Sequence, residues 1–339
     1  NQERWKRVLR TLDRSIGKAI GEEYVKVYFP KEAKERMEEL VSYLKRSFEQ
    51  RIDRLDWMTS ETKQKAKKKL DVINVKIGYP DKWTDYTKLE ITDRPYVLNV
   101  LASREFNIKK NISEIGHPVD RDKWFMNPQT VNAYYSPTMN EIVFPAAILQ
   151  PPFFYLHGDD AVNFGAIGMV IGHEMTHGFD DQGRHYDEKG NLNDWWNTED
   201  AEQFTIRSQV LVDQYNNYVM LDSLTINGEL SLGENIADVG GLSIAYTAFK
   251  LKQADNNSND TVLIDGFTPE QRFFISYAQI WRNNIRDKEL MRQLHEGPHS
   301  PGEARVNGVV YNIDDFYIVF DISPNNPRYI PKEERASIW

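Results

Sequence analysis

The stretch VIGHEMTHGFDDQG, residues 170–183, places two histidines four residues apart with a glutamate between them. Residues four apart lie on the same face of a helix, so the rings of His173 and His177 can converge on one point. The preceding segment, AVNFGAIGMVI, consists mainly of small and aliphatic residues that are typical of a buried helix. Two imidazoles are costly to bury unless something binds them. The pattern therefore favours a metal site over two core histidines that are satisfied by hydrogen bonds.

A second stretch, SLGENIADVGG at residues 231–241, offers the further ligand that such a site needs. A catalytic zinc usually takes three protein ligands and leaves its fourth position to water. Glu234 and Asp238 are four apart near the start of a predicted helix, so one carboxylate can ligate while the other accepts a hydrogen bond from a ligating imidazole. The alternative is that both only favour the positive end of the helix dipole. The histidine pair favours ligation.

The composition of the 339-residue chain, 40% hydrophobic and 27% charged, is that of an ordinary globular protein. A net charge of −9 disfavours nucleic acid as a partner. We expect no membrane span in this chain, because its longest apolar candidate, residues 161–179, contains both histidines and the glutamate. Cysteine is absent, so a metal must be held by nitrogen and oxygen. Residue 1 is not Met and no signal-peptide pattern follows it, which predicts that the sequence begins inside a longer precursor.

The hydrophobic pattern predicts an α+β fold that is predominantly α-helical. Residues 1–78 are read as three helices, residues 79–94 as a turn-rich linker and residues 95–339 as the catalytic domain. One N-terminal helix carries an apolar stripe, which we expect to pack against another element. The stripe consists of Met37, Leu40, Val41, Leu44, Phe48, Ile52 and Leu55.

Within the predicted catalytic domain, helices are expected near residues 95–109, 200–216, 234–253 and 269–285. Residues 130–135 and 141–144, joined through SPTMN, predict a β-hairpin, and residues 253–260 predict a loop. The lysine run KQKAKKKL, residues 63–70, indicates either an anion site or the solvated face of a helix, and we prefer the second interpretation.

Six separated motifs carry a family resemblance: VNAYYS, FPAAILQPPFF, GMVIGHEMTHGFDDQGR, GENIADVGGL, YAQIW and HSPGEAR. In this order they resemble the neprilysin-type (M13) zinc endopeptidases over essentially the whole chain. The resemblance implies a zincin-like (thermolysin-like) catalytic domain with a small β-sheet, preceded by helices of an incomplete covering lobe. It also implies that this chain is the C-terminal half of the family architecture and that the missing N-terminal half of the same protein is its partner.

The resemblance assigns one zinc ion to His173, His177 and Glu234, with Asp238 orienting a ligating ring. Glu174 would be the general base. Zinc lowers the pKa of its bound water towards about 7 and polarises the scissile carbonyl. A carboxylate beside the metal takes the water's proton and later passes it to the departing amine. The implied substrates are oligopeptides.

Two residues of HSPGEAR gain roles only through the resemblance. His299 matches the family's transition-state donor, and Arg305 matches the residue that grips substrate carbonyls. Donors aimed at an oxyanion are worth roughly 3–4 kcal/mol each in acyl-transfer enzymes. The family commonly has an acidic residue where this chain has Gly297, which leaves the orientation of His299 in question.

The resemblance also implies a substrate cleft. Asn132 and Ala133 match the segment that holds the substrate backbone, where a peptide adds to a strand edge through sequence-tolerant hydrogen bonds. Spacing alone indicates core residues at six further positions. They match the family's apolar pocket for the residue after the scissile bond: Ile148, Phe153, Met169, Val170, Ile280 and Trp281. This match implies cleavage on the amino side of large hydrophobic residues.

Family chains commonly end in Cys-x-x-Trp, whereas this chain has Ala336 at the cysteine and keeps Trp339. Together with the absence of cysteine elsewhere, this favours a bacterial member over a vertebrate ectodomain. We expect a location in the bacterial cell envelope or outside the cell, with the cytoplasm as the alternative. Two other functions stay open: a zinc-containing peptide-binding protein without turnover, and a family fragment that is inactive without its upstream half.

Overall fold

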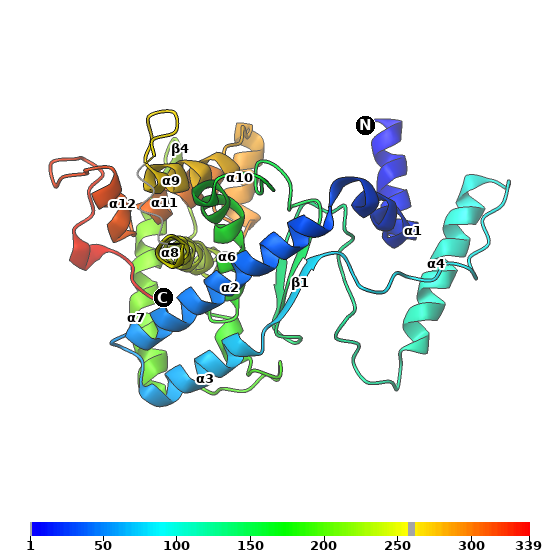
Figure 1. The fold of residues 1–339 in the computed structure, drawn as a ribbon, viewed down its shortest axis with the longest axis horizontal. Coiled ribbons are helices and arrows are strands. Elements are labelled where there is room, and N and C mark those ends of the chain that lie inside the picture. Colours follow the sequence, from blue (N-terminus) through cyan, green and yellow to red (C-terminus); the bar gives the residue numbers. More distant parts are fainter. Residues whose placement is uncertain (1, 257–261) are drawn as a thin grey trace. The chain divides into compact units, whose positions relative to one another are not determined.

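The structure, a computed structural model, describes residues 2–256 and 262–339, and this part of the chain is mostly helical (Figure 1). The α-helices are α1 (Arg4–Tyr28), α2 (Lys31–Arg54), α3 (Ser60–Asp71), α4 (Tyr96–Ser113), α5 (Asp160–Asn163), α6 (Met169–His177), α7 (Thr198–Asn216), α8 (Leu232–Asp255), α9 (Pro269–Ile280), α10 (Asp287–Glu296), α11 (Gly302–Val310) and α12 (Asp314–Val319). The strands are β1 (Asn74–Gly78), β2 (Tyr134–Ser136), β3 (Glu141–Pro145), β4 (Val219–Leu221) and β5 (Leu224–Thr225). A π-helix, η1 (Phe164–Gly168), and two 3-10 helices, η2 (Gly183–His185) and η3 (Lys332–Glu334), complete the set.

The four helices that the sequence predicts in the catalytic domain correspond to α4, α7, α8 and α9, although α9 ends five residues earlier than expected. The predicted loop at 253–260 is partly wrong, because residues 253–255 still belong to α8. Its residues 257–260 lie outside the described residues. No described helix combines the length and the apolarity that crossing a membrane requires.

The chain divides into two compact units, whose bounds differ from the predicted domains. The first unit comprises residues 1–35, 76–132 and 143–149. Within it, α1 packs against α4, and α1 also approaches the segment 127–129 very closely. A Cβ atom on Gly17 would lie 2.2 Å from Asn127 Nδ2, so glycine permits this contact. Asp13 of α1 accepts hydrogen bonds from the side-chain amides of Asn127 and Gln129.

The second unit comprises residues 36–75, 133–142 and 150–339. In this division most of α2 and all of α3 lie in the same unit as α6, the helix that carries both histidines. The apolar stripe of α2 is buried, with Met37, Leu44, Phe48 and Ile52 at 0% exposure. Ser47 Oγ donates to the Ile244 carbonyl of α8 at 2.8 Å, so α8 is a packing partner of this stripe. Periodicity predicts such a stripe but not the element that covers it.

A three-stranded sheet has the order β1–β3–β2, which makes β2 an outer strand. The turn between β2 and β3 closes through hydrogen bonds from Met139 N to Ser136 O and from Asn140 N to Pro137 O. The predicted hairpin is therefore present, but its first strand begins at Tyr134 and not at residue 130. A pattern of β-forming residues cannot locate where ladder pairing starts.

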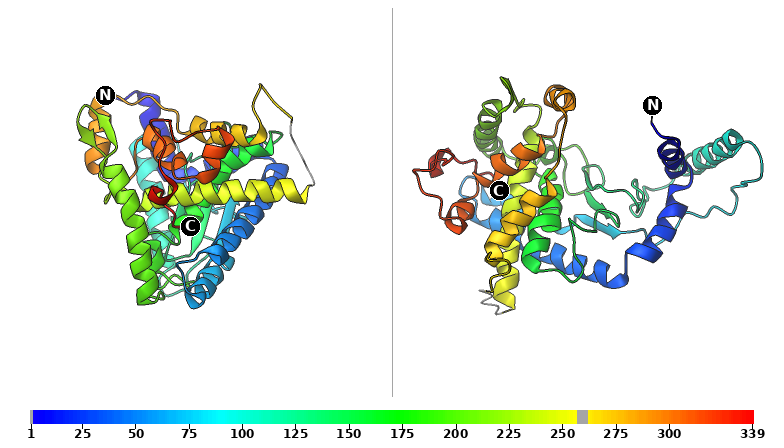
Figure 2. Two further views of the ribbon diagram at one scale, coloured as in Figure 1. Left: turned by 90° about the vertical axis from the view of Figure 1, so that its left-hand side faces the viewer. Right: turned by 90° about the horizontal axis from the view of Figure 1, so that it is seen from above.

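The crossing of α6 and α8 forms the centre of the second unit, and Figure 2 shows α8 from two sides. Gly172 of α6 faces Gly241 of α8. A Cβ atom on Gly172 would lie 2.7 Å from the Gly241 carbonyl oxygen, and one on Gly241 would lie 2.5 Å from the His173 nitrogen. Only glycine at both positions allows the two backbones to come this close. The result is that the first turns of α8 lie beside the histidines of α6.

Candidate metal centre

Two imidazoles and one carboxylate converge where α6 and α8 meet. The Nε2 atoms of His173 and His177 are 2.9 Å apart. The Glu234 carboxylate lies 3.3 Å from the first of these nitrogens and 3.8 Å from the second. One donor atom from each of the three residues lies within 4.8 Å of the others, as a metal site requires. The structure thus brings together the three predicted ligands.

The outer nitrogen of each ring is held by a carboxylate. His173 Nδ1 lies 2.8 Å from Asp238 Oδ1, and His177 Nδ1 lies 2.7 Å from Asp180 Oδ2. An ionised carboxylate can only accept, so both Nδ1 atoms donate. In the neutral rings the Nε2 atoms are then the two acceptor nitrogens, and their lone pairs are available to a metal ion. The Glu234 Oε2 atom beside them is buried without a hydrogen bond.

Arg305 holds the carboxylate that orients His173. Its Nε and Nη2 atoms donate to the two oxygens of Asp238 at 2.7 and 2.6 Å, and its guanidinium stacks 3.8 Å from the centre of the Trp281 ring. Arg305 is 7% exposed and Asp238 is 0% exposed. The structure therefore places Arg305 against Asp238, while its predicted grip on substrate carbonyls stays a prediction.

The acid–base properties of the cluster follow from burial and from these pairings. Burial alone would raise the pKa of Asp238, but Arg305 and His173 outweigh it and lower that pKa to about 2. Burial would lower the pKa of His173, yet its hydrogen bond to Asp238 helps to raise that pKa to about 10. Without a metal, a proton occupies the place of the cation. A metal ion must therefore displace this proton when it binds.

Glu174 lies between the two histidines on α6 and is 7% exposed. It is not one of the three converging ligands. Burial raises its pKa, and the two histidines oppose that rise. A carboxylate that is desolvated but does not ligate is suited to accept a proton, which is the role that the resemblance gives it.

His299 lies at the edge of this cluster, with Nε2 3.1 Å from Glu234 Oε1 and with a side chain that is 53% exposed. The next residue anchors its loop, since Ser300 Oγ donates to Asn235 Oδ1 at 2.8 Å and both residues are buried. Burial lowers the pKa of His299, and the charge of Glu234 opposes the shift. Its predicted function as an oxyanion donor stays a prediction.

The residues predicted to hold the substrate backbone lie at the start of β2. Asn132 is exposed and Ala133 is 9% exposed, and both precede Tyr134, where the outer strand begins. β2 packs against α6. Within the second unit, an outer strand edge therefore runs beside the helix that carries the histidines.

The predicted apolar pocket is spread over several elements. Met169 and Val170 are the first two residues of α6 and are 0% and 8% exposed. The carbonyl of Phe153 accepts a hydrogen bond from the backbone N–H of Ile167 in η1. Ile280 ends α9 and Trp281 follows it. Ile148, at 5% exposure, belongs to the first unit. Whether these side chains bind a substrate residue stays a prediction.

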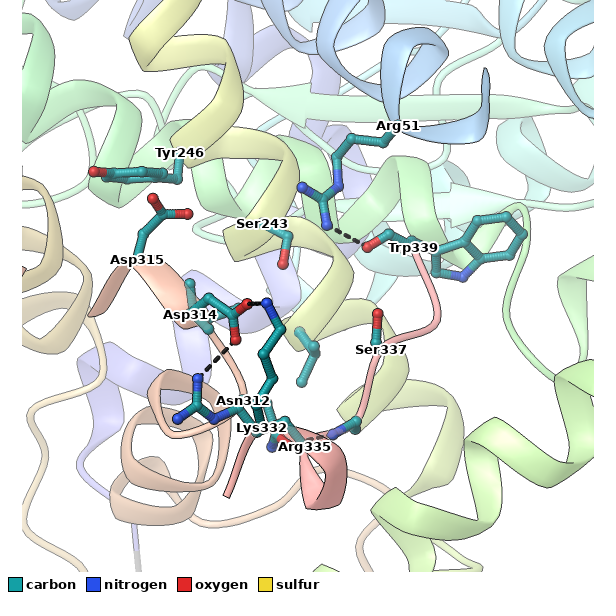
Figure 3. Close-up of a pocket in the computed structure, with 13 residues that line it drawn as sticks. Arg51, Ser243, Tyr246, Asn312, Asp314, Asp315, Lys332, Arg335, Ser337 and Trp339 are labelled. Carbon is teal, nitrogen blue, oxygen red and sulfur yellow. Dashed lines mark hydrogen bonds and ion pairs between the residues drawn. The ribbon is translucent and has the colours of Figure 1, made fainter. Parts of the chain in front are cut away.

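A separate pocket of about 220 Å³ lies in the second unit, between α8 and the last residues of the chain (Figure 3). Three of its charged groups are paired with each other, since Asp314 lies 2.7 Å from Lys332 and 2.7 Å from Arg335. Arg51 donates to the carbonyl of Trp339. None of the predicted site residues lines this pocket, so it is distinct from the metal centre.

Sequence reasoning missed two polar groups around the cluster. Asp180 follows His177 by three residues and was visible in the quoted stretch, but only the turn after α6 brings its carboxylate to the ring. Lys69 was assigned to a solvated face, whereas the structure buries it at 1% exposure. Helical periodicity offered a signal, because Lys69 lies three residues after Ala66 and four residues before Ile73, and both are buried.

Comparison with known proteins agrees with this geometry. Sequence profiles of peptidase family M13 match residues 132–336 and 1–80. Neprilysin-3 of Drosophila melanogaster is 38% identical, covering 100% of this chain and 44% of that protein. Human endothelin-converting enzyme 1 is also 38% identical, covering 99% of this chain and 44% of that protein.

Solved structures with the same fold are those of the Mycobacterium tuberculosis zinc metalloprotease Zmp1, bound to an inhibitor, and of PepO from Lactobacillus rhamnosis. Zmp1 has a TM-score of 0.93 and 46% identity over 100% of this chain and 51% of its own. PepO has a TM-score of 0.86 and 31% identity over 96% of this chain and 50% of its own. The predicted fold, a predominantly helical α+β catalytic fold of the thermolysin-like type, is confirmed.

The chain spans about half the length of these relatives. Its cluster of two imidazoles and a carboxylate fits zinc, which accepts nitrogen and oxygen ligands in this number. The family matches and this donor set confirm zinc as the predicted cofactor. On its sequence and on its fold, this chain belongs to peptidase family M13.

Proposed function

We propose that this chain carries the active site of a zinc-dependent endopeptidase that hydrolyses oligopeptides on the amino side of large hydrophobic residues. The observation that carries the proposal is the convergence of His173, His177 and Glu234 beside a non-ligating Glu174. Structural zinc sites are generally closed by four protein ligands, whereas three ligands leave one position open for chemistry.

Zinc, when bound, supplies polarisation of the scissile carbonyl and a lower pKa for the attacking water. Glu174 takes the proton of that water and delivers it to the departing amine. Asp238 and Asp180 keep the two rings in the tautomer that presents Nε2 to the metal. The position of His299, half exposed beside Glu234, supports a role as donor to the oxyanion.

The edge of β2 supports binding of an extended peptide, because an outer strand offers main-chain groups that any sequence can use. Selection of a large apolar residue would then come from the side chains at the start of α6 and at the end of α9. The end of α9 lies near the metal cluster, since the ring of Trp281 lies against Arg305, which in turn holds Asp238.

The test is a comparison of zinc content and peptide cleavage between the wild-type chain and Glu174→Gln. The variant is expected to keep one zinc per chain and to lose kcat by about 10²–10⁴-fold, because the amide cannot accept the proton. Mass spectrometry of the products should show new N-termini at large hydrophobic residues. Equal cleavage by both proteins would remove Glu174 as the base. A wild-type chain that holds one zinc and retains peptides uncut would favour the peptide-binding alternative.

A further inference from the structure

Lys69 is a lysine on the buried face of α3, together with Thr62, Ala66 and Leu70. Its side chain is 1% exposed. Neighbouring lysines of α3 instead pair at the surface: Lys67 Nζ lies 2.8 Å from Asp53, and Lys68 Nζ lies 2.6 Å from Glu188. The burial of Lys69 is therefore specific to this position and is not a property of the lysine run.

The ammonium of Lys69 has three donors, and three main-chain carbonyls accept them. Nζ lies 2.6 Å from Gly178 O, 2.8 Å from Gly183 O and 2.7 Å from Tyr186 O. The centre of the Phe179 ring lies 5.3 Å away. The hydrogen-bonding capacity of the buried group is thus fully used by a single short segment, residues 178–186.

This segment is the turn that carries Asp180. Gly178 directly follows the ligand His177 and caps α6. At the other end, Gly183 N donates to Asp180 Oδ1 at 2.6 Å. A Cβ atom on Gly183 would lie 1.8 Å from the His177 carbonyl oxygen, so the turn folds directly onto the end of α6. Lys69 therefore binds both ends of the turn whose carboxylate holds the His177 ring.

A lysine is costly at this position. Burial lowers the pKa of Lys69 to about 7, and the charge of Asp180 acts against this shift. An apolar side chain would fill the same volume without that cost, but it would remove one donor from each of the three carbonyls. Gly183 O would keep Tyr186 N, and Tyr186 O would keep Trp195 Nε1. The C-terminal end of a helix also favours a cation. The three carbonyls account for a lysine here, and their place in the chain links it to the metal centre.

We propose that Lys69 is a positioning residue for the metal ligand His177, and that it acts by clamping the turn that holds Asp180. The inference rests on the proposed zinc site and adds to it a residue from a helix that contributes no ligand. Carboxylates that orient a metal-bound imidazole typically change metal affinity by about 10–100-fold when they are removed. Loss of the clamp should have an effect of that order.

The first experiment measures zinc affinity by chelator competition, together with the visible spectrum of the Co²⁺-substituted protein. Lys69→Met is expected to lose about 10–100-fold in zinc affinity and to alter the Co²⁺ spectrum. The matched control Lys67→Met, two residues away and paired only at the surface, should stay within about twofold of wild type. Equal zinc affinity of Lys69→Met and wild type overturns the inference. A wild-type chain that binds no zinc would instead overturn the proposed site itself.

A second experiment separates the positioning role from a general effect on folding. The chain has no cysteine, so Lys69→Cys introduces a unique thiol. In the unfolded protein this thiol displaces bromide from 2-bromoethylamine, which restores an ammonium at lysine length. Reaction with 1-bromopropane gives a side chain of equal length that ends in a methyl group. Both forms are refolded beside a wild-type sample treated in the same way.

The aminoethyl form is expected to recover wild-type zinc affinity and the wild-type Co²⁺ spectrum, while the propyl form keeps the loss seen in Lys69→Met. Equal zinc affinities of the two forms overturn the inference. Failure of the propyl form alone to refold also overturns it, because Lys69 would then support the whole fold. A double variant tests whether Lys69 acts through Asp180. If it does, the fold loss in zinc affinity of Lys69→Met combined with Asp180→Asn is smaller than the product of the fold losses of the two single variants.

Discussion

The crossing of α6 and α8 and the helix α4 show opposite relations between sequence and packing. Along α8, residues 235–246 are all buried, and α6 is buried from Met169 to Thr176. Along α4, Ser103 is the one buried residue, while Leu101 is 51% and Ile112 59% exposed. The position of the site helices is therefore fixed by contacts within this chain. Most apolar residues of α4 are exposed, while Val100 and Phe106 are partly covered, the second by the ring of Tyr86.

This difference shows that the geometry of the metal cluster is determined at the crossing of α6 and α8. The two glycines of the crossing allow the backbones to touch, and this contact brings Glu234 and Asp238 to the histidines. Nothing in the metal cluster depends on a residue of α4. Substitutions should therefore disturb the protein strongly in one region and weakly in the other.

The largest effect is expected for Leu242→Ala in α8. Leu242 is 0% exposed, so its removal leaves a cavity within the buried stretch of α8. Such substitutions reduce the free energy of unfolding by about 2–5 kcal/mol. Denaturant unfolding of the metal-free variant measures this loss. A change below about 1 kcal/mol would show that the crossing is not the tightly packed centre described above.

A smaller effect is expected for Asp180→Asn, which keeps the size of the side chain but weakens its hold on the His177 ring. Zinc affinity should fall by about 10–100-fold, while the metal-free protein keeps most of its stability. Chelator competition and thermal melting measure the two quantities. Unchanged zinc affinity would mean that the carboxylate does not orient the ligand.

The pH dependence of zinc binding comes next in size. The hydrogen bond to Asp238 helps to raise the pKa of His173 in the metal-free protein to about 10, so this ring holds a proton at neutral pH. Zinc must displace that proton, and protons compete more strongly with zinc for the ring as the pH falls. The dissociation constant should therefore rise by about tenfold for each unit of pH lost between 8 and 6. A flat profile at pH 6, 7 and 8 would contradict this assignment of the proton.

The smallest effect is expected for Leu101→Ala in α4, the matched counterpart of Leu242→Ala. Because Leu101 is half exposed, its removal opens no cavity. The free energy of unfolding of this chain should change by no more than about 0.5 kcal/mol. A loss as large as that of Leu242→Ala would show that α4 is packed as firmly as the site helices.

The metal centre could be predicted from the sequence because helical spacing aligns His173 with His177 and Glu234 with Asp238, and the family resemblance indicated which carboxylate would bind the metal. The helices of the catalytic region were predictable for the same reason. The clamp by Lys69 and the support by Asp180 could not be derived, since they depend on how the turn after α6 folds and on which face of α3 meets it. The packing of α2 against α8 could not be predicted either, because an apolar stripe does not indicate which element covers it.

The central claim is that two imidazoles and one glutamate bind a single zinc ion with one position left open. Anomalous diffraction at the zinc edge, on crystals of the zinc-loaded chain, tests it most directly. We predict one peak at about 2.0–2.2 Å from His173 Nε2, His177 Nε2 and a Glu234 oxygen, with no fourth side chain bound. A peak away from Glu234, or a fourth protein ligand closing the site, would contradict the account.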